Sequence, residues 1–120
     1  MTSLSFADLA VKLKGWGYKV SKDPKEQAVP GEIILKYDLD MEPEDISMSV
    51  YKVTHEIEMA WIELVPDAIA GNIAALMVHL GMQYSCESHF EIGRPKIDRG
   101  NGTTYVVKLS VSWVQWLTVQ

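Results

Sequence analysis

Near the start of the chain, apolar side chains recur at steps of three and four residues. They are Phe6, Leu9, Ala10, Leu13 and Trp16. This spacing predicts a short amphipathic helix. Ser5 and Asp8 have the spacing of a capping box at the start of the helix, and Gly17 favours a stop after Trp16.

From Glu32 the period of the pattern changes to two, which predicts half-buried strands. In a first strand, Ile33, Leu35, Tyr37 and Leu39 form the apolar face. In a second strand, from about Ser47 to Glu63, the corresponding face carries Tyr51, Val53, His55, Ile57, Met59 and Trp61.

A second helix is predicted to begin at Pro66 and to end at Gly81. Its buried stripe is Ile69, Ile73, Leu76, Met77 and Leu80. At about 100° per residue, the far side carries Ala70, Gly71, Ala74 and Val78. A helix with so few polar residues is not expected to face open water, and its small residues let another backbone approach closely.

Two more alternating segments, Tyr84 to Ile92 and Tyr105 to Trp113, predict strands, with the loop Gly93 to Gly102 between them. The predicted order is helix, strand, strand, helix, strand, strand. This order favours an α+β two-layer sandwich, in which a four-stranded antiparallel sheet carries both helices on one face.

The composition fits one domain spanning residues 1–120. With 48% hydrophobic residues, the chain can bury a core without a disulfide or a structural metal. A net charge of −5 argues against a surface built for nucleic acid. The start has no signal-peptide pattern, and the longest weakly polar stretch, Ala68 to Leu80, is too short to cross a bilayer. We therefore expect a cytoplasmic protein that does not enter a membrane.

The three residues that suggest a metal site do not share one face of the predicted fold. His79 belongs to the second helix, and the odd step from Cys86 to His89 sends these side chains to opposite faces of a strand. A tetrahedral zinc site would also lack a fourth ligand. We expect no metal and no cofactor, and we expect Cys86 to be a small buried residue.

Catalytic motifs are not found in the sequence: it has no Gly-x-Ser-x-Gly elbow and no glycine-rich phosphate loop. Glu87, His89 and Glu91 would share the polar face of one strand, where a carboxylate beside an imidazole suits acid–base catalysis. Alternating charge is usual on a solvated strand face, however. We therefore assign no catalytic residue.

Charged residues are concentrated in two segments. Five of the eight residues from Asp38 to Asp45 are acidic, which we interpret as a solvated turn, with a docking loop for a basic partner as the alternative. An EF-hand is rejected, because Pro43 and Ser49 stand where that loop needs glycine and glutamate.

The second segment is basic. It contains Arg94, Lys96 and Arg99, which remain candidates for binding an anion such as a phosphate or an acidic peptide. A soluble hairpin tip is the simpler interpretation, because no aromatic residue alternates with these side chains.

His55 is the histidine that the strand pattern places among apolar residues. A buried histidine usually bonds to a neighbour and stays neutral, so a core role is the simpler interpretation. If a pocket lies between sheet and helices, His55 and the hydroxyls of Tyr51 and Tyr105 are the polar groups best placed to line it.

The end of the last strand is apolar on both faces, because Val114 and Trp116 fall on the side that is otherwise polar. A strand of this kind is usually covered, either by its own fold or by a partner. We add Trp116 to the residues of the second helix as a candidate for an interface.

The order of predicted elements is similar to that of the specialised chaperones of bacterial type III secretion, which commonly have one more strand between the helices. The resemblance is one of topology and size. It implies a homodimer, joined through the second helix, that binds an extended client on its sheet.

The preferred hypothesis is a non-enzymatic binding protein that acts through protein–protein contact. We expect a homodimer through Ala70, Gly71, Ala74 and Val78, and possible contact with another protein. The alternative is a small-ligand-binding or enzymatic domain with a pocket around His55.

Overall fold

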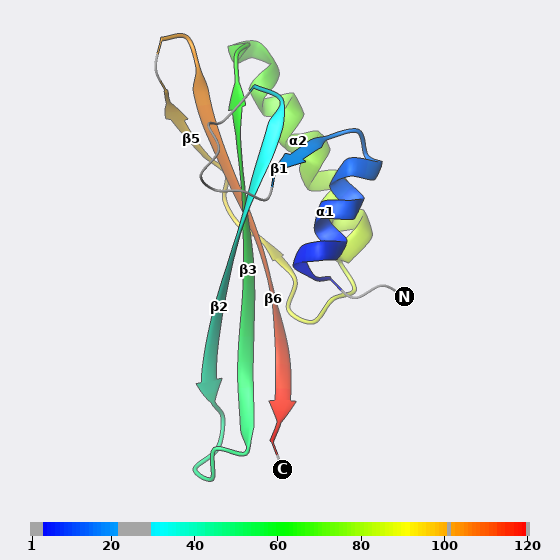
Figure 1. The fold of residues 1–120 in the computed structure, drawn as a ribbon, viewed down its shortest axis with the longest axis vertical. Helices are drawn as coiled ribbons and strands as arrows, with labels where there is room; N and C mark the ends of the chain where they lie inside the picture. Colours follow the sequence, from blue (N-terminus) through cyan, green and yellow to red (C-terminus); the bar gives the residue numbers. More distant parts are fainter. Residues whose placement is uncertain (1–3, 22–29, 101, 120) are drawn as a thin grey trace.

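Three long strands form the frame of the molecule (Figure 1): β2 (Glu32–Pro43), β3 (Val50–Glu63) and β6 (Tyr105–Thr118). Short strands β1 (Lys19–Ser21), β4 (Glu91–Ile92) and β5 (Lys96–Arg99) pair along their sides. The helices are α1 (Phe6–Gly15) and α2 (Pro66–Tyr84). This computed structural model describes residues 4–21, 30–100 and 102–119.

The protein is α+β, with two helices and a mixed sheet of six strands. The strand order is β1-β2-β3-β6-β4, and β5 also pairs with β6. The α+β prediction is confirmed. The prediction of four antiparallel strands was incomplete, because β1 and β5 were missed and β1 runs parallel to β2. Three residues are too few to show a period, which explains why β1 left no signal.

The ends of both helices follow from local chemistry. Ser5 caps α1 as predicted, since its Oγ accepts a hydrogen bond from the Asp8 N–H at 3.1 Å. Helix α2 passes Gly81 and ends at Tyr84. Tyr84 is buried, and its hydroxyl donates to Asp8 Oδ2 at 2.6 Å. This anchor to α1 adds the last turn of α2 that the glycine rule did not predict.

The predicted strand from Tyr84 to Ile92 is wrong over most of its length. Turns follow α2, and only Glu91 and Ile92 pair with β6. His89 has a φ of 53°, a left-handed backbone incompatible with a strand. Cys86 lies in these turns and is exposed, so the expectation that it is buried was also wrong. Alternation in this segment reflects turn residues and not a strand.

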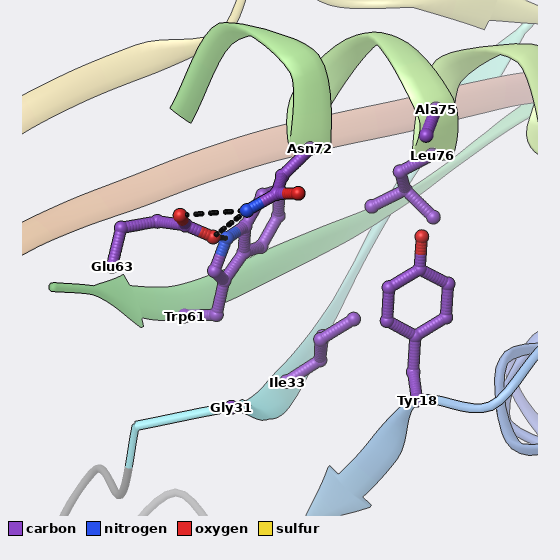
Figure 2. A pocket seen from close by; sticks show the side chains of 8 residues that line it. All are labelled: Tyr18, Gly31, Ile33, Trp61, Glu63, Asn72, Ala75 and Leu76. Atoms are coloured by element: carbon purple, nitrogen blue, oxygen red, sulfur yellow. Dashed lines mark hydrogen bonds between the residues drawn. The ribbon is translucent and has the colours of Figure 1, made fainter. Parts of the chain in front are cut away.

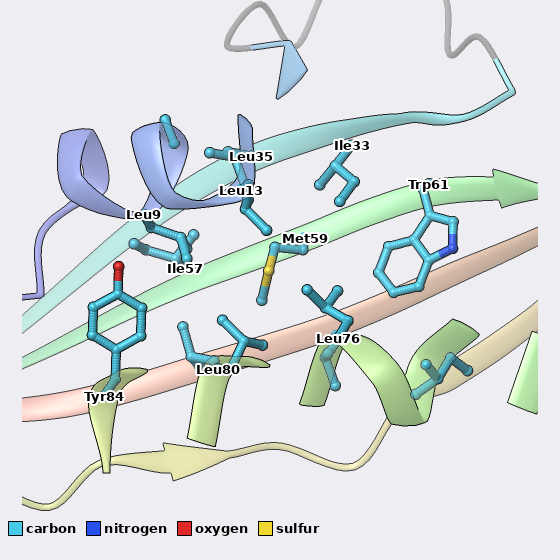
Figure 3. Close-up of a cluster of buried hydrophobic side chains, with 14 of the residues drawn as sticks. Leu9, Leu13, Ile33, Leu35, Ile57, Met59, Trp61, Leu76, Leu80 and Tyr84 are labelled. Carbon is cyan, nitrogen blue, oxygen red and sulfur yellow. The ribbon is translucent and has the colours of Figure 1, made fainter. Parts of the chain in front are cut away.

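Both helices pack on the same face of the sheet (Figure 3), which we call the inner face. Odd-numbered residues of the long strands point to this face. The strands contribute Ile33, Leu35, Ile57, Met59, Trp61, Val107, Leu109, Val111 and Trp113 to one buried cluster. The helices contribute Leu9, Ala10, Leu13, Ile69, Ile73, Leu76, Leu80 and Tyr84.

Beyond the helices, the long strands continue as an arm (Figure 1), which we define as residues 37–56 and 113–119. The arm makes the molecule elongated, with extents of 54 × 28 × 22 Å. Its cross-strand register continues that of the core, with Met41 opposite Val53 and Val53 opposite Gln115. The arm is therefore the same sheet without a helix layer.

Candidate functional site

A groove of about 700 Å³ lies where the arm leaves the helices. Its walls come from the start of α1, the turns after α2, the inner face of the sheet and the even-numbered residues Val114 and Trp116 near the end of β6. The lining residues are Leu4, Ser5, Phe6, Tyr37, His55, Glu87, Ser88, Trp113, Val114, Gln115 and Trp116. The volume is in the range of small-molecule sites.

His55 lines this groove and is half-buried between two hydrogen-bond partners. Its Nδ1 is 2.6 Å from the Tyr37 hydroxyl, and its Nε2 is 3.0 Å from Gln115 Oε1. With the proton on Nε2, the ring donates to Gln115 and accepts from Tyr37. The ring also stacks on Trp113, with centroids 4.8 Å apart and planes at 9°. Both nitrogens are therefore engaged, as expected for a satisfied histidine.

The other two predicted pocket residues lie elsewhere. Tyr51 is opposite Leu117 at the far end of the arm, and Tyr105 is opposite Glu63 at the other end of the sheet. Tyr51 and Glu63 are separated along β3 by about 40 Å, at about 3.3 Å per residue. The structure thus brings His55 into a groove without Tyr51 or Tyr105. Its actual partners, Tyr37 and Gln115, come from neighbouring strands, and only the strand register could have identified them.

A second, smaller pocket lies between α2 and the upper end of the sheet (Figure 2). It measures about 220 Å³ and is lined by Tyr18, Gly31, Ile33, Trp61, Glu63, Asn72, Ala75 and Leu76. The Glu63 carboxylate accepts hydrogen bonds from Trp61 Nε1 at 2.9 Å and from Asn72 Nδ2 at 2.9 and 3.1 Å. The side chains of Glu63, Trp61 and Asn72 therefore bind one another, and the other lining residue with a polar side-chain group is Tyr18, through its hydroxyl.

The predicted interface residues of α2 lie on its exposed side. Ala70, Gly71, Ala74 and Val78 are all exposed, and Val78 retains 59% of its accessible surface. Met82, one turn beyond Val78, is 81% exposed. Its exposure was missed because the helix was expected to end before it. We call these five residues the helix face. No charged residue occurs from Ala68 to Tyr84.

Trp116 is not beside the helix face. It lies on β6 in the arm, opposite Lys52, and contacts His89 edge to face with ring centroids 5.4 Å apart. It lines the groove and remains 47% exposed. The turns after α2 therefore partly cover the apolar end of β6, through Trp116 and through a hydrogen bond from the Val114 N–H to the Ser88 carbonyl at 2.9 Å.

The predicted anion-binding residues are exposed on or beside β5. Arg94 precedes the strand, Lys96 pairs with Lys108, and Arg99 pairs with Tyr105. Because Lys96 and Arg99 are three residues apart, they point to opposite faces of the sheet. The structure therefore does not gather the three cations around one point.

The inner side of the arm is the surface that sequence reasoning missed. Its residues are Tyr37, Leu39, Met41, Pro43, Tyr51, Val53, His55, Trp113, Gln115 and Leu117, which we call the arm face. None of these residues is Asp, Glu, Lys or Arg, and Leu39 and Met41 are about half exposed. Alternation marked these positions as apolar, but it could not show that the helices end before reaching them.

Acidic residues occupy the outer side and the tip of the arm. Asp45 organises the tip: its carboxylate accepts hydrogen bonds from the hydroxyls of Ser47 and Ser49, both at 2.7 Å, and from the Ser49 N–H at 2.9 Å. These bonds favour the charged form and lower the pKa of Asp45 to about 2. Ile46 is fully exposed beside it.

Among the described residues, no cluster of three or more His, Cys, Asp or Glu side chains has a geometry that could hold a metal ion. His79 stacks on Trp16, with ring centroids 4.9 Å apart, and His89 contacts Trp116. The described helices include none with the length and apolar character needed to span a membrane.

A comparison of the sequence with protein-family models finds no match, and neither does a comparison with curated proteins.

Proposed function

We propose that this chain is a non-enzymatic binding protein that acts through protein–protein contact as a homodimer. The observation that carries the proposal is the helix face, an exposed side of a 19-residue helix with no charged residue from Ala68 to Tyr84. An exposed apolar surface of this kind is typical of interaction sites.

The small residues Ala70, Gly71 and Ala74 support the proposal, because they let a second surface approach the helix backbone closely. The topology supports it as well. The order of elements is similar to that of the type III secretion chaperones, and β1 adds a third strand between the helices, as is common in those proteins. In those proteins the second helix joins the dimer.

Static light scattering at tens of micromolar tests the proposal. We expect a mass of twice the 13.5 kDa of one chain. Val78→Glu should reduce the mass to that of a monomer, because it buries a carboxylate in the apolar contact. Gln83→Glu is the matched control, since it adds the same charge to the same helix at about 140° around the axis from Val78. A monomeric wild type would contradict the proposal.

The groove at His55 supports a second candidate function, the binding of a small apolar or aromatic ligand. Phe6, Tyr37, Trp113 and Trp116 supply aromatic walls, and Gln115 and Glu87 supply polar groups. Because two tryptophans line the groove, a bound ligand should change the intrinsic fluorescence. A panel of small aromatic compounds that leaves the fluorescence of the wild type unchanged would remove this candidate.

A further inference from the structure

The described residues leave two apolar surfaces exposed on the inner side of the molecule. The helix face points away from the sheet, because Val78 lies about 180° around the helix from the buried stripe that contains Leu76 and Leu80. The arm face is the continuation of the inner face beyond the helices (Figure 1). The two surfaces therefore follow one another along the long axis. The helix layer lies above one half, and the described residues place no helix above the other half beyond the groove at its base.

The charge distribution limits what can cover the arm face. The arm carries Asp38, Asp40, Glu42, Glu44, Asp45 and Glu56 against Lys52 alone. Its net charge is therefore −5, equal to that of the whole chain, so the remaining residues are neutral in sum. Two arms packed face to face would bring two segments of this charge together, which opposes that packing weakly, because their acids point outward and salt screens charges more than about 8 Å apart.

The dimensions of the two faces match. The helix face runs along α2 from Ala70 to Met82, about 20 Å at 1.5 Å per residue. The arm part of β2, from Tyr37 to Pro43, spans about 23 Å. A two-fold axis across the middle of the long axis lays each arm over the helices of the other copy. The acidic tip of one copy then lies towards the end of its partner that carries β5, with Lys96 and Arg99.

We propose that two copies pack antiparallel about a two-fold axis, so that the arm face of each copy covers the helix face of the other. This inference rests on the proposed function and names the surface that the helix face binds. Each arm thereby gains the helix layer that its own chain does not supply, and the two acidic arms are kept apart. The dimer is isologous, because the same pair of surfaces meets twice.

The area favours this reciprocal arrangement over a contact between two helix faces. Each helix face or arm face can be treated as a flat strip about 23 Å long and about 10 Å wide, with an area on the order of 250 Å². Two helix faces in contact would bury on the order of 500 Å², whereas specific interfaces bury about 1,200 Å² or more. The reciprocal dimer buries four faces. Their flat area is on the order of 1,000 Å², and the side chains that project from each face add to this value.

Complementary charge variants test the arrangement. Val78→Glu alters the helix face and Leu39→Lys alters the arm face, and both residues are more than half exposed in the single chain. We expect each variant alone to be a monomer, with a dissociation constant raised at least about 100-fold by the two buried charges. An equimolar mixture should form a heterodimer, because one contact is native and the other pairs the introduced carboxylate of one chain with the introduced ammonium group of the other.

Thr54→Lys is the matched control for Leu39→Lys. Thr54 points to the outer face of the arm, opposite Asp40, so the change adds the same charge to the same arm without touching the arm face. This control should remain a dimer. Circular dichroism and thermal unfolding of every variant show whether each chain is folded.

The possible results separate this inference from the proposed function. If Val78→Glu is a monomer and Leu39→Lys remains a dimer, the helix face forms the dimer and the arm does not cover it, which overturns the antiparallel packing alone. If the wild type is a monomer, both proposals are wrong. If the two folded variants are monomers that do not associate when mixed, the reciprocal contact is also overturned.

Discussion

The two halves of β3 have the same alternating pattern but different surroundings. Ile57 and Met59 are fully buried under the helices, whereas Tyr51 lies uncovered in the arm and is only partly buried by its neighbours. The difference comes from what lies above the strand and not from the strand itself. Alternation therefore tells which side of a sheet is apolar, while burial depends on how far the covering helices extend.

Charge divides the molecule at the same place. The arm holds the entire net charge of −5, and the helix-covered body is neutral in sum. A bare sheet exposes backbone edges and apolar side chains, and acidic residues along it oppose pairing with another copy of itself. The acidic residues of the arm thus keep the outer side and the edge of β2 soluble, while the inner side stays uncharged.

The largest expected effect comes from making the same substitution, leucine to alanine, once in the body and once in the arm. Leu80→Ala removes a fully buried side chain under the helices, and Leu39→Ala removes one that is 51% exposed in the arm. We expect a loss of about 3 kcal/mol in the free energy of unfolding for Leu80→Ala and less than about 1 kcal/mol for Leu39→Ala. Urea denaturation of dilute protein measures both.

The two leucine variants also show whether a second copy covers the arm. If a second copy covers the arm in solution, the cost of Leu39→Ala should rise with protein concentration, because dimerisation stabilises the folded chain by mass action. The cost of Leu80→Ala should not depend on concentration to this extent. Equal losses for both variants at low concentration would mean that the arm is as well packed as the body.

A smaller effect is expected from two tyrosine hydroxyls. Tyr84→Phe removes the partly buried hydrogen bond to Asp8, which joins the end of α2 to the first turn of α1. We expect a loss of about 1–2 kcal/mol in the free energy of unfolding. Tyr51→Phe in the arm should change it by less than about 0.5 kcal/mol. Thermal denaturation of both variants checks the prediction, and a neutral Tyr84→Phe would contradict it.

A third pair compares two polar caps, one in each half. Ser5→Ala removes the cap of α1 and should lower the free energy of unfolding by about 1 kcal/mol. Asp45→Ala removes the cap of the tip, where the surrounding backbone is exposed. The tip amides should exchange faster with solvent while global stability stays unchanged. Hydrogen exchange followed by NMR separates the two outcomes, and a global loss in Asp45→Ala would show that the arm folds as one unit with the body.

The sequence predicts the helices and the long strands better than the groove, for a physical reason. Ser5, Pro66 and the stripe from Ile69 to Leu80 act within their own helix, and both helices were predicted close to their observed bounds. The groove depends on contacts between distant segments. Tyr37, His55 and Gln115 meet across three strands, and their contact depends on a register that no local pattern contains.

The smallest expected effect concerns the tip of the arm in acid. The pKa of Asp45 is lowered from 3.8 to about 2, first by the Ser49 and Ser47 hydroxyls, which donate to its charged form. The contribution of this carboxylate to the stability of the folded tip is therefore complete above about pH 4. It is lost as the pH falls through about 2. In the double variant Ser47→Ala/Ser49→Ala, the pKa of Asp45 should return towards 3.8. NMR titration of the Asp45 carboxyl group in both proteins measures the shift. An unchanged pKa in the double variant would mean that the backbone N–H groups of Ser49 and Val50 alone lower the pKa of Asp45. The amide signals of the body provide the internal control, because they should not shift with the titration of Asp45.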